Sequence, residues 1–284
     1  MQREPAWRVF AAEYNASRHH IKATEPMTPS YVVTPLGAKI SRLFVVGVLT
    51  EVQVVSDEAL RARVVDQTGP FFIYAGKFRP SVRQVLEITK TPQFIALVGK
   101  ISVYTPNEDT MYVSIIPERI KVVDEKLRDY WVFDTAKKLK VRIEAMQEAL
   151  KMENPTQSQL MDLGFSKRIS EGVISAISFY EKIDIEKYLD MLKSALKHLL
   201  PEYQELGYEL PGVEEEEEED IDVELEEKVL SLIEELDDGT GASYDELLEI
   251  LKVDRADLDM ALDALKDRGE IYEPRIGKIK RMNP

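Results

Sequence analysis

The sequence contains no cysteine, and only three of its 284 residues are histidines. Without a thiol the chain can form no disulfide, no thiolate metal site and no cysteine nucleophile. The histidines are His19, His20 and His198. Two adjacent histidines cannot both point at one metal from a regular element, so we do not expect a zinc site. No other cofactor is indicated, and we expect none.

Long apolar runs and the common catalytic motifs are also missing. No window approaches the roughly 20 apolar residues of a membrane span, and the opening MQREPAWRVFAAEY lacks the apolar stretch of a signal peptide. Neither a GxxxxGK[ST] phosphate loop nor a GxSxG nucleophile elbow occurs. We therefore expect a soluble intracellular protein that is not an enzyme.

Charge is distributed unevenly along the chain. The formal net charge is −15, but residues 201–284 hold 28 acidic and 9 basic residues, a net of −19. The first 200 residues hold 24 acidic and 28 basic residues, a net of +4. The first part can approach phosphates, whereas the second should repel them. We also expect the acidic run in 213–222 to compete with a nucleic acid for the basic part.

Residues 38–123 have the pattern of a small β-barrel. Three stretches rich in β-branched and aromatic residues (42–55, 59–66 and 70–76) precede a short helix that starts at Pro80, and two further strands follow. Three strands, a helix and two strands is the plan of the OB-fold, a five-stranded Greek-key barrel that binds oligonucleotides.

The rest of the chain divides around this barrel, and the overall class is α+β and multidomain. Helical periodicity dominates after the barrel, and six consecutive glutamates separate it from a last compact unit. The expected parts are an irregular N-terminal arm (1–37), the OB-fold domain (38–123), a helical assembly region (124–200), an acidic flexible linker (201–222) and a winged-helix domain (223–284).

Aromatic and basic residues recur along the barrel strands, which is the combination that single-strand binding requires. Flat side chains stack with bases, and cations neutralise phosphates. The competing interpretation is that some of the phenylalanines fill the core of a small barrel. The candidates for nucleic-acid binding are Arg61, Arg63, Phe72, Tyr74, Lys77, Phe78, Arg79, Lys100, Tyr104 and Tyr112.

A heptad-like seam follows the barrel, with apolar residues at spacings of 4, 3, 4, 3 and 4. It is typical of a helix that bundles with other subunits, although a helix that folds back onto its own barrel would show a similar pattern. The seam residues, and so the expected subunit interface, are Val132, Ala136, Leu139, Ile143, Met146 and Leu150.

Three helical stretches and a basic hairpin in 223–284 predict a winged helix. Its third helix is rich in aspartate, which suits the negatively charged major groove of DNA badly. We therefore expect a protein-docking module, with DNA contact through the wing as the alternative. The expected docking residues are Asp257, Met260, Arg275 and Lys278.

Together these features resemble the replication protein A family, in particular the middle subunit and its archaeal relatives. The stretches that carry the resemblance are VVDQTGPFFIYAGKF (64–78), ALVGKISVYTPNEDTMYVSIIPERI (96–120) and LKDRGEIYEPRIGKIKRM (265–282). In that family the third and fifth strands carry stacking aromatics, and Tyr74 and Tyr112 lie near those places.

The resemblance implies a single-stranded DNA-binding subunit of an archaeal complex in replication, repair and recombination. It implies other subunits of that complex as partners, a nucleoid-associated cytoplasmic location, and replication or repair proteins recruited by the winged helix. Two alternatives stay open: an assembly subunit with little DNA contact of its own, and a winged-helix DNA-binding regulator.

Overall fold

The computed structural model describes most of the chain in two compact units. One comprises residues 1–103 and 113–213, the other residues 104–112 and 214–284. The described residues are 4–23, 28–56, 59–76, 79–105, 110–200 and 223–282, except 238, 240, 254–257, 259–260, 263–264, 267–269 and 276.

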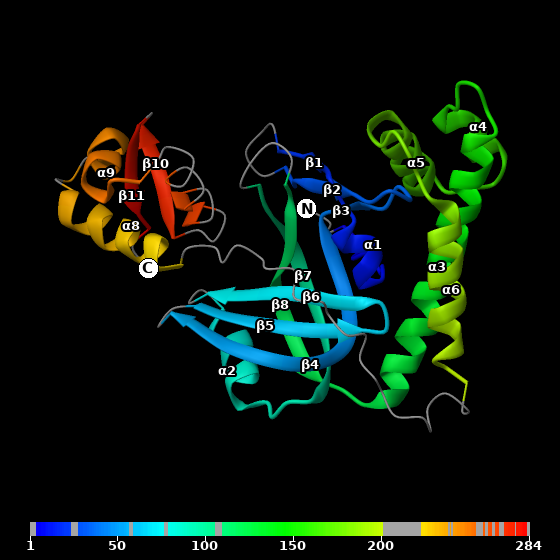
Figure 1. Cartoon of the computed structure of the whole chain (residues 1–284), viewed down its shortest axis with the longest axis horizontal. Coiled ribbons are helices and arrows are strands. Elements are labelled where there is room, and N and C mark those ends of the chain that lie inside the picture. Colours follow the sequence, from blue (N-terminus) through cyan, green and yellow to red (C-terminus); the bar gives the residue numbers. More distant parts are fainter. Residues whose placement is uncertain are drawn as a thin grey trace. The chain divides into compact units, whose positions relative to one another are not determined.

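The centre of the first unit is a closed five-stranded barrel (Figure 1). Its strands follow the circular order β4-β5-β6-β8-β7, and a parallel pairing of β6 with β8 at Ile73 and Ile115 closes it. This is the expected OB-like barrel. Its elements are β4 (Arg42–Ser56), β5 (Ala59–Asp66), β6 (Gly69–Gly76), α2 (Pro80–Ile88), β7 (Gln93–Tyr104) and β8 (Tyr112–Val122).

Strand β4 bends, and it pairs with a different strand along each half of its length. It pairs with β7 along its first half and with β5 along its second half. Gly47 lies immediately before the residues that pair on both sides, Val48 and Leu49, and a Cβ atom on it would come within 2.6 Å of the Val65 carbonyl oxygen. Only glycine allows so close an approach of two backbones at a barrel corner.

Residues 1–37 are not the irregular arm that the sequence predicted. They contain helix α1 (Ala11–Asn15) and strands β1 (His19–Ile21) and β2 (Tyr31–Val33), which form a three-stranded sheet with β3 (Lys39–Ile40). The Tyr14 hydroxyl donates a 2.7 Å hydrogen bond to the Ser114 carbonyl of β8. Phe10 packs edge-on against Trp131, with 5.7 Å between the ring centroids. The prolines interrupt the helical and strand patterns, while scattered aromatic side chains anchor the segment by burial.

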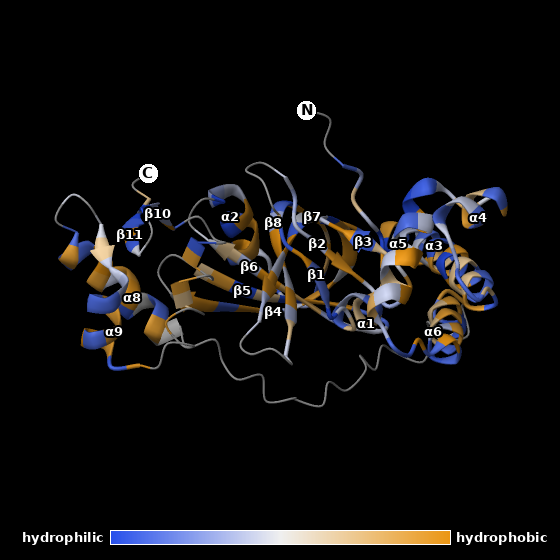
Figure 2. Ribbon diagram, turned by 90° about the horizontal axis from the view of Figure 1, so that it is seen from above, coloured by the Kyte–Doolittle hydropathy of each residue, from blue (hydrophilic) through white to orange (hydrophobic). Residues whose placement is uncertain are grey.

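Between residues 125 and 200, four helices follow the barrel, and the longest of them packs on its own chain. The ribbons of α3 and α6 run side by side (Figures 1 and 2), and both carry hydrophobic and hydrophilic residues. Of the six seam residues, five are buried within this one chain, and Leu150 is 50% exposed. The chain itself therefore covers the seam, although mainly with α6 and α5 and only partly with strand β4 of the barrel. The helices are α3 (Glu125–Leu150), α4 (Gln157–Asp162), α5 (Lys167–Phe179) and α6 (Ile185–Lys197).

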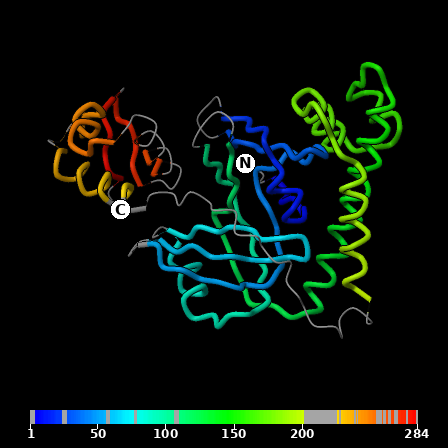
Figure 3. The backbone as a smooth tube through the Cα atoms, viewed as in Figure 1, coloured from blue at the N-terminus to red at the C-terminus, as the bar shows by residue number. Residues whose placement is uncertain are grey.

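Residues 223–282 of the second unit, whose backbone is coloured yellow to red in Figure 3, have a hydrophobic core of their own. Helices pack against a three-stranded sheet in the order β10-β11-β9, and Leu258, Ala261, Leu262, Leu265 and Lys266 are also helical. Across the described parts of both units, no helix is long and apolar enough to cross a membrane. The elements are α8 (Val223–Leu236), β9 (Ala242–Ser243), α9 (Tyr244–Leu251), β10 (Ile271–Arg275) and β11 (Lys278–Arg281).

Candidate nucleic-acid interface

The outer face of β5 and β6 brings together four of the predicted residues. Side chains alternate along a strand, so the apolar residues of β5 point into the barrel and the arginines point outward. In an antiparallel pair, directly opposed residues share one face. Strand register therefore builds two outward rows across β4, β5 and β6: Gln53–Arg61–Tyr74 and Glu51–Arg63–Phe72.

The same alternation separates the two adjacent phenylalanines. Phe71 is completely buried, whereas Phe72 is partly exposed on the outer face. The question of core or surface therefore has a different answer for each ring. The Arg61 guanidinium carbon lies 5.2 Å from the centroid of the Phe72 ring. A cation held over an aromatic face in this way is positioned without losing its charge.

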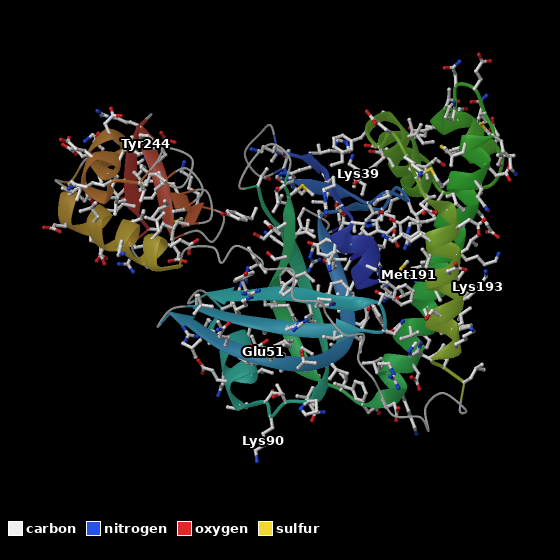
Figure 4. The ribbon with its side chains drawn as sticks, viewed as in Figure 1. Lys39, Glu51, Lys90, Met191, Lys193 and Tyr244 are labelled. Atoms are coloured by element: carbon white, nitrogen blue, oxygen red, sulfur yellow. The ribbon has the colours of Figure 1, made fainter. Side chains whose placement is uncertain are left out.

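Arg63 is the second cation of this face. Its Nε atom is buried and has no hydrogen-bond partner among the described residues. Glu51 lies directly opposite on β4, is exposed, and is labelled on the barrel in Figure 4. Buried donors are normally paired, so this Nε atom is an exception, and the outward-facing guanidinium of Arg63 is a candidate cation for a phosphate oxygen.

A buried carboxylate shapes the turn at which this face begins. Asp66 accepts hydrogen bonds from the backbone nitrogen of Thr68 at 2.7 Å and of Gly69 at 3.2 Å. It also accepts one from the backbone nitrogen of Ala11 at 2.8 Å, which ties α1 to the β5–β6 turn. Burial raises the pKa of Asp66 to about 6, although these hydrogen bonds act in the opposite direction.

The other predicted barrel residues lie elsewhere. Lys100 is opposite Arg42, on the β4–β7 side of the barrel, where Arg42 pairs with Glu118. Arg79 is exposed and immediately precedes α2. The structure does not bring these two onto the β5–β6 face. Lys77 and Phe78 lie outside the described residues.

Tyr104 and Tyr112 form a stacked pair of their own. They are the last residue of β7 and the first of β8, with 6.1 Å between ring centroids and 21° between ring planes. Both belong to the segment grouped with the second compact unit. Their pairing shows that two of the predicted aromatics contact each other directly, which the sequence did not indicate.

In the second unit, Arg275 and Lys278 are opposite each other in the β10–β11 hairpin. Asp257 and Met260 lie outside the described residues. Two other hairpin cations are neutralised within the unit, since Lys280 lies 3.2 Å from Asp237 and Arg281 pairs with Glu234. The positive charge available on this hairpin is therefore smaller than the sequence suggests.

Sequence reasoning missed Glu51 and Gln53, the two polar residues that β4 adds to the outer face. Their alternation with Val52 is visible in the sequence. Their partners on β5 depend on a register shift between Leu49 and Glu51, and such irregularities cannot be read from a single strand.

Comparison with known proteins found solved structures that are similar to this chain. No protein-family model matches the sequence, and no curated protein matches it. The S. pombe Stn1-ten1 complex aligns over 45% of this chain and 85% of the matched chain, at 11% identity and a TM-score of 0.35.

Two further similar structures are a complex with single-stranded DNA and a single-stranded DNA-binding protein. A replication protein A heterotrimer bound to single-stranded DNA aligns over 44% of this chain and 86% of the matched chain, at 13% identity and a TM-score of 0.31. The S. cerevisiae mitochondrial single-stranded DNA-binding protein Rim1 aligns over 30% and 94%, at 14% identity and a TM-score of 0.26.

Proposed function

We propose that this chain is a single-stranded DNA-binding protein that binds through the outer face of β5 and β6. The observation that carries the proposal is the clustering of Arg61, Arg63, Phe72 and Tyr74 on one outward surface of an OB-like barrel. This strand pair is the surface on which OB-folds bind oligonucleotides. The role is binding without catalysis, in an archaeal complex related to replication protein A that acts in replication, repair and recombination.

The chemistry of the face fits a single strand better than a duplex. Phe72 and Tyr74 offer rings on which unpaired bases can stack, with each stacked base contributing about 1–3 kcal/mol. Arg61 and Arg63 add cations beside those rings, where phosphates follow the bases. A duplex keeps its bases stacked inside, so it would use the cations and leave the rings unused.

The test is a salt titration of the full-length protein with a fluorescent single-stranded oligonucleotide and a duplex control. Tyr74→Ala should weaken binding by about 5-fold or more, because a stacking surface is lost. Arg63→Gln should also weaken binding and reduce the log–log salt slope by about 0.7, because one phosphate contact is lost.

Matched controls come from exposed residues outside this face. Tyr130→Ala on α3 and Arg119→Gln on β8 remove the same kinds of side chain from exposed positions, and we expect unchanged binding. Equal affinity of wild type, Tyr74→Ala and Arg63→Gln would reject the face. A preference for duplex would favour the alternative of a DNA-binding regulator.

Partnership with other subunits needs a surface other than the seam, because five seam residues are buried within the chain. The opposite side of α3 exposes Tyr130, Phe133 and Val141, with Lys137 5.7 Å from the Phe133 ring centroid. We assign subunit contact to this exposed side, and recruitment of replication or repair proteins to a winged helix in the second unit.

A further inference from the structure

A second cluster of aromatic and basic residues lies outside the barrel, where β1 meets the end of α5. The His19 ring stacks on the Phe179 ring, with 4.3 Å between centroids and 14° between planes. Phe179 is nevertheless 46% exposed. Tyr180 packs edge-on against Phe179 at 5.1 Å. An exposed aromatic stack of this kind is a surface that a base can extend.

Hydrogen bonds hold the stack rigidly in place. The Tyr180 hydroxyl donates to the Val33 carbonyl at 2.6 Å and accepts from the Arg18 backbone nitrogen at 2.8 Å. This one phenol therefore joins β2, the start of β1 and the end of α5. Burial raises the pKa of Tyr180, so the hydroxyl keeps the proton that it donates. A preorganised platform loses little conformational entropy when a ligand binds.

Exposed cations lie close to the stack in the sequence. Arg18 directly precedes His19, and its Nη1 atom donates to the carbonyls of Asn15 and Ser17, both at 2.8 Å, so its exposed guanidinium is held at the end of α1. Lys22 and Lys182 are also exposed. Within the described part of the chain, none of these three cations forms an ion pair with a carboxylate. Their charge is available to an anionic ligand.

Direct contacts connect this cluster to the barrel face. Residues 70, 72 and 74 lie on the outer side of β6, so the row Tyr74–Phe72 leads to Pro70, in steps of about 6.6 Å. The Asn15 side-chain nitrogen donates to the Pro70 carbonyl at 2.9 Å, and the Asn15 carbonyl accepts from Arg18. The barrel face and the His19–Phe179 stack are thus neighbours on one compact unit.

We infer that Arg18, His19 and Phe179 form a second contact for the same DNA strand, beyond the start of β6. A base stacks on the His19–Phe179 pair, and Arg18, Lys22 and Lys182 contact the adjoining phosphates. This inference rests on the proposed function, because the strand first has to occupy the β5–β6 face. It extends the binding site from the barrel onto the N-terminal segment and α5.

A two-part site makes a length-dependent prediction. Once the barrel holds one part of a strand, the second contact is intramolecular and gains from a high effective concentration. An oligonucleotide of about 8 nucleotides is within the range of a single OB-fold, whereas one of about 30 nucleotides reaches both contacts. The second contact should therefore matter only for the longer oligonucleotide.

The experiment measures the affinity of the full-length protein for both oligonucleotides by fluorescence anisotropy. Phe179→Leu keeps apolar bulk but loses the stacking surface, and Arg18→Gln removes the central cation. Each should weaken binding of the long oligonucleotide at least about 5-fold and leave the short one unchanged. Phe179→Tyr keeps the ring and should retain wild-type affinity.

The controls are an exposed apolar residue and an exposed cation that lie outside the His19–Phe179 cluster. Leu163, 53% exposed at the end of α4, is replaced by Ala, and Lys193 on α6, labelled in Figure 4, by Gln. We expect neither to change binding of either oligonucleotide. Thermal unfolding of every variant reports whether the fold is intact.

Two results would overturn the inference. Wild-type affinity of Phe179→Leu and Arg18→Gln for the long oligonucleotide would show that the cluster makes no DNA contact. Equal weakening for both lengths would show an indirect effect on the barrel. In either case, wild-type binding of the short oligonucleotide and its loss in Arg63→Gln would leave the proposed function standing. Absence of short-oligonucleotide binding by the wild type would instead reject the proposed function.

Discussion

Asp66 shows how a single buried residue supports the candidate interface. Its carboxylate accepts hydrogen bonds from Ala11, Thr68 and Gly69, so the turn that begins β6 and the helix α1 share one acceptor. A carboxylate removed from water costs free energy when it is ionised, even with several donors around it. The position of the β5–β6 turn is therefore coupled to one protonation equilibrium.

The pKa of Asp66 implies a pH dependence of stability with a definite sign. Burial raises the folded-state pKa of Asp66 to about 6 from an ordinary value of 3.8, so the folded state binds more protons between these values. The contribution to the free energy of unfolding should fall as pH rises from about 4 to 6, by an amount on the order of 3 kcal/mol. Urea unfolding of wild type and Asp66→Asn between pH 4 and 7 measures this difference.

The variant Asp162→Asn controls for the loss of a negative charge, because Asp162 is exposed on α4. We expect it to follow the wild-type pH profile. A constant difference between wild type and Asp66→Asn across this pH range would contradict the assignment. A wild-type free energy of unfolding that rises relative to that of Asp66→Asn as pH increases would contradict the expected sign.

At the scale of elements, close backbone contacts decide how α5 joins the N-terminal sheet. A Cβ atom on Gly172 of α5 would lie 1.8 Å from the Gly37 carbonyl oxygen in the turn between β2 and β3. Gly37 itself has a φ of +80°, which favours glycine. The Lys39 Nζ atom pairs with Glu171 at 2.7 Å beside this contact. Two glycines thus allow helix and turn to meet without side chains between them.

Gly172→Ala should destabilise the protein despite the higher helix propensity of alanine. The clash with the Gly37 carbonyl forces α5 away from the turn, and overpacking of this kind typically costs about 1–3 kcal/mol. Ser175→Ala on the same helix is the control, because the Ser175 hydroxyl has no hydrogen bond to a described residue and the backbone carbonyl that accepts from Ser178 is retained. A thermal midpoint of Gly172→Ala equal to or above wild type would contradict the close approach.

The displacement of α5 has a second consequence. Phe179 is the last residue of this helix, so the His19–Phe179 stack should loosen in Gly172→Ala. Under the inference above, binding of a long oligonucleotide should weaken while a short one binds as before. This links a packing defect in the middle of α5 to DNA binding at its C-terminal end.

At the scale of the whole molecule, charge is the property that matters most for a nucleic-acid ligand. The first 200 residues have a net charge of +4, and residues 201–284 a net charge of −19. Six consecutive glutamates at 214–219 contribute much of this difference. A tethered polyanion competes with DNA for the same cations at a high effective concentration.

Replacing Glu214–Glu219 by glutamine should tighten binding of single-stranded DNA at low salt, because the competing charge is removed at constant tether length. The effect should diminish as salt rises, since screening shortens the range of the repulsion. A salt titration of the variant against wild type measures both. Equal affinities at low salt would show that the acidic run does not compete with DNA for the binding surface.

Several features of the barrel were predictable because they are local. The alternation of Leu60, Ala62 and Val64 with Arg61 and Arg63 assigns each β5 side chain to a face, and the structure confirms that assignment. The order of strands and helix predicted an OB-like barrel, which the circular strand order confirms. Periodicity depends only on backbone geometry, so a single sequence reveals it.

The seam of α3 was predictable as a pattern but not in its partner. Periodicity identified its apolar side, and burial of Leu139 and Met146 confirms that this side is packed. Whether another subunit or the same chain covers it depends on contacts distant in sequence. Here Arg142 of α3 pairs with Glu13 of α1, and both side chains are almost fully buried. No local sequence pattern predicts this ion pair.

The sequence by itself determined which β5 residues face outward, the order of the barrel strands and α2, and how charge divides between the two ends of the chain. The tertiary structure decided which outward residues meet. Register aligned Arg61 with Tyr74 and Arg63 with Phe72, and packing of α5 placed Phe179 on His19, 160 residues away in sequence. Faces follow from the local backbone period, whereas neighbours across strands and helices follow from long-range hydrogen bonds and burial, which exist only in the folded chain.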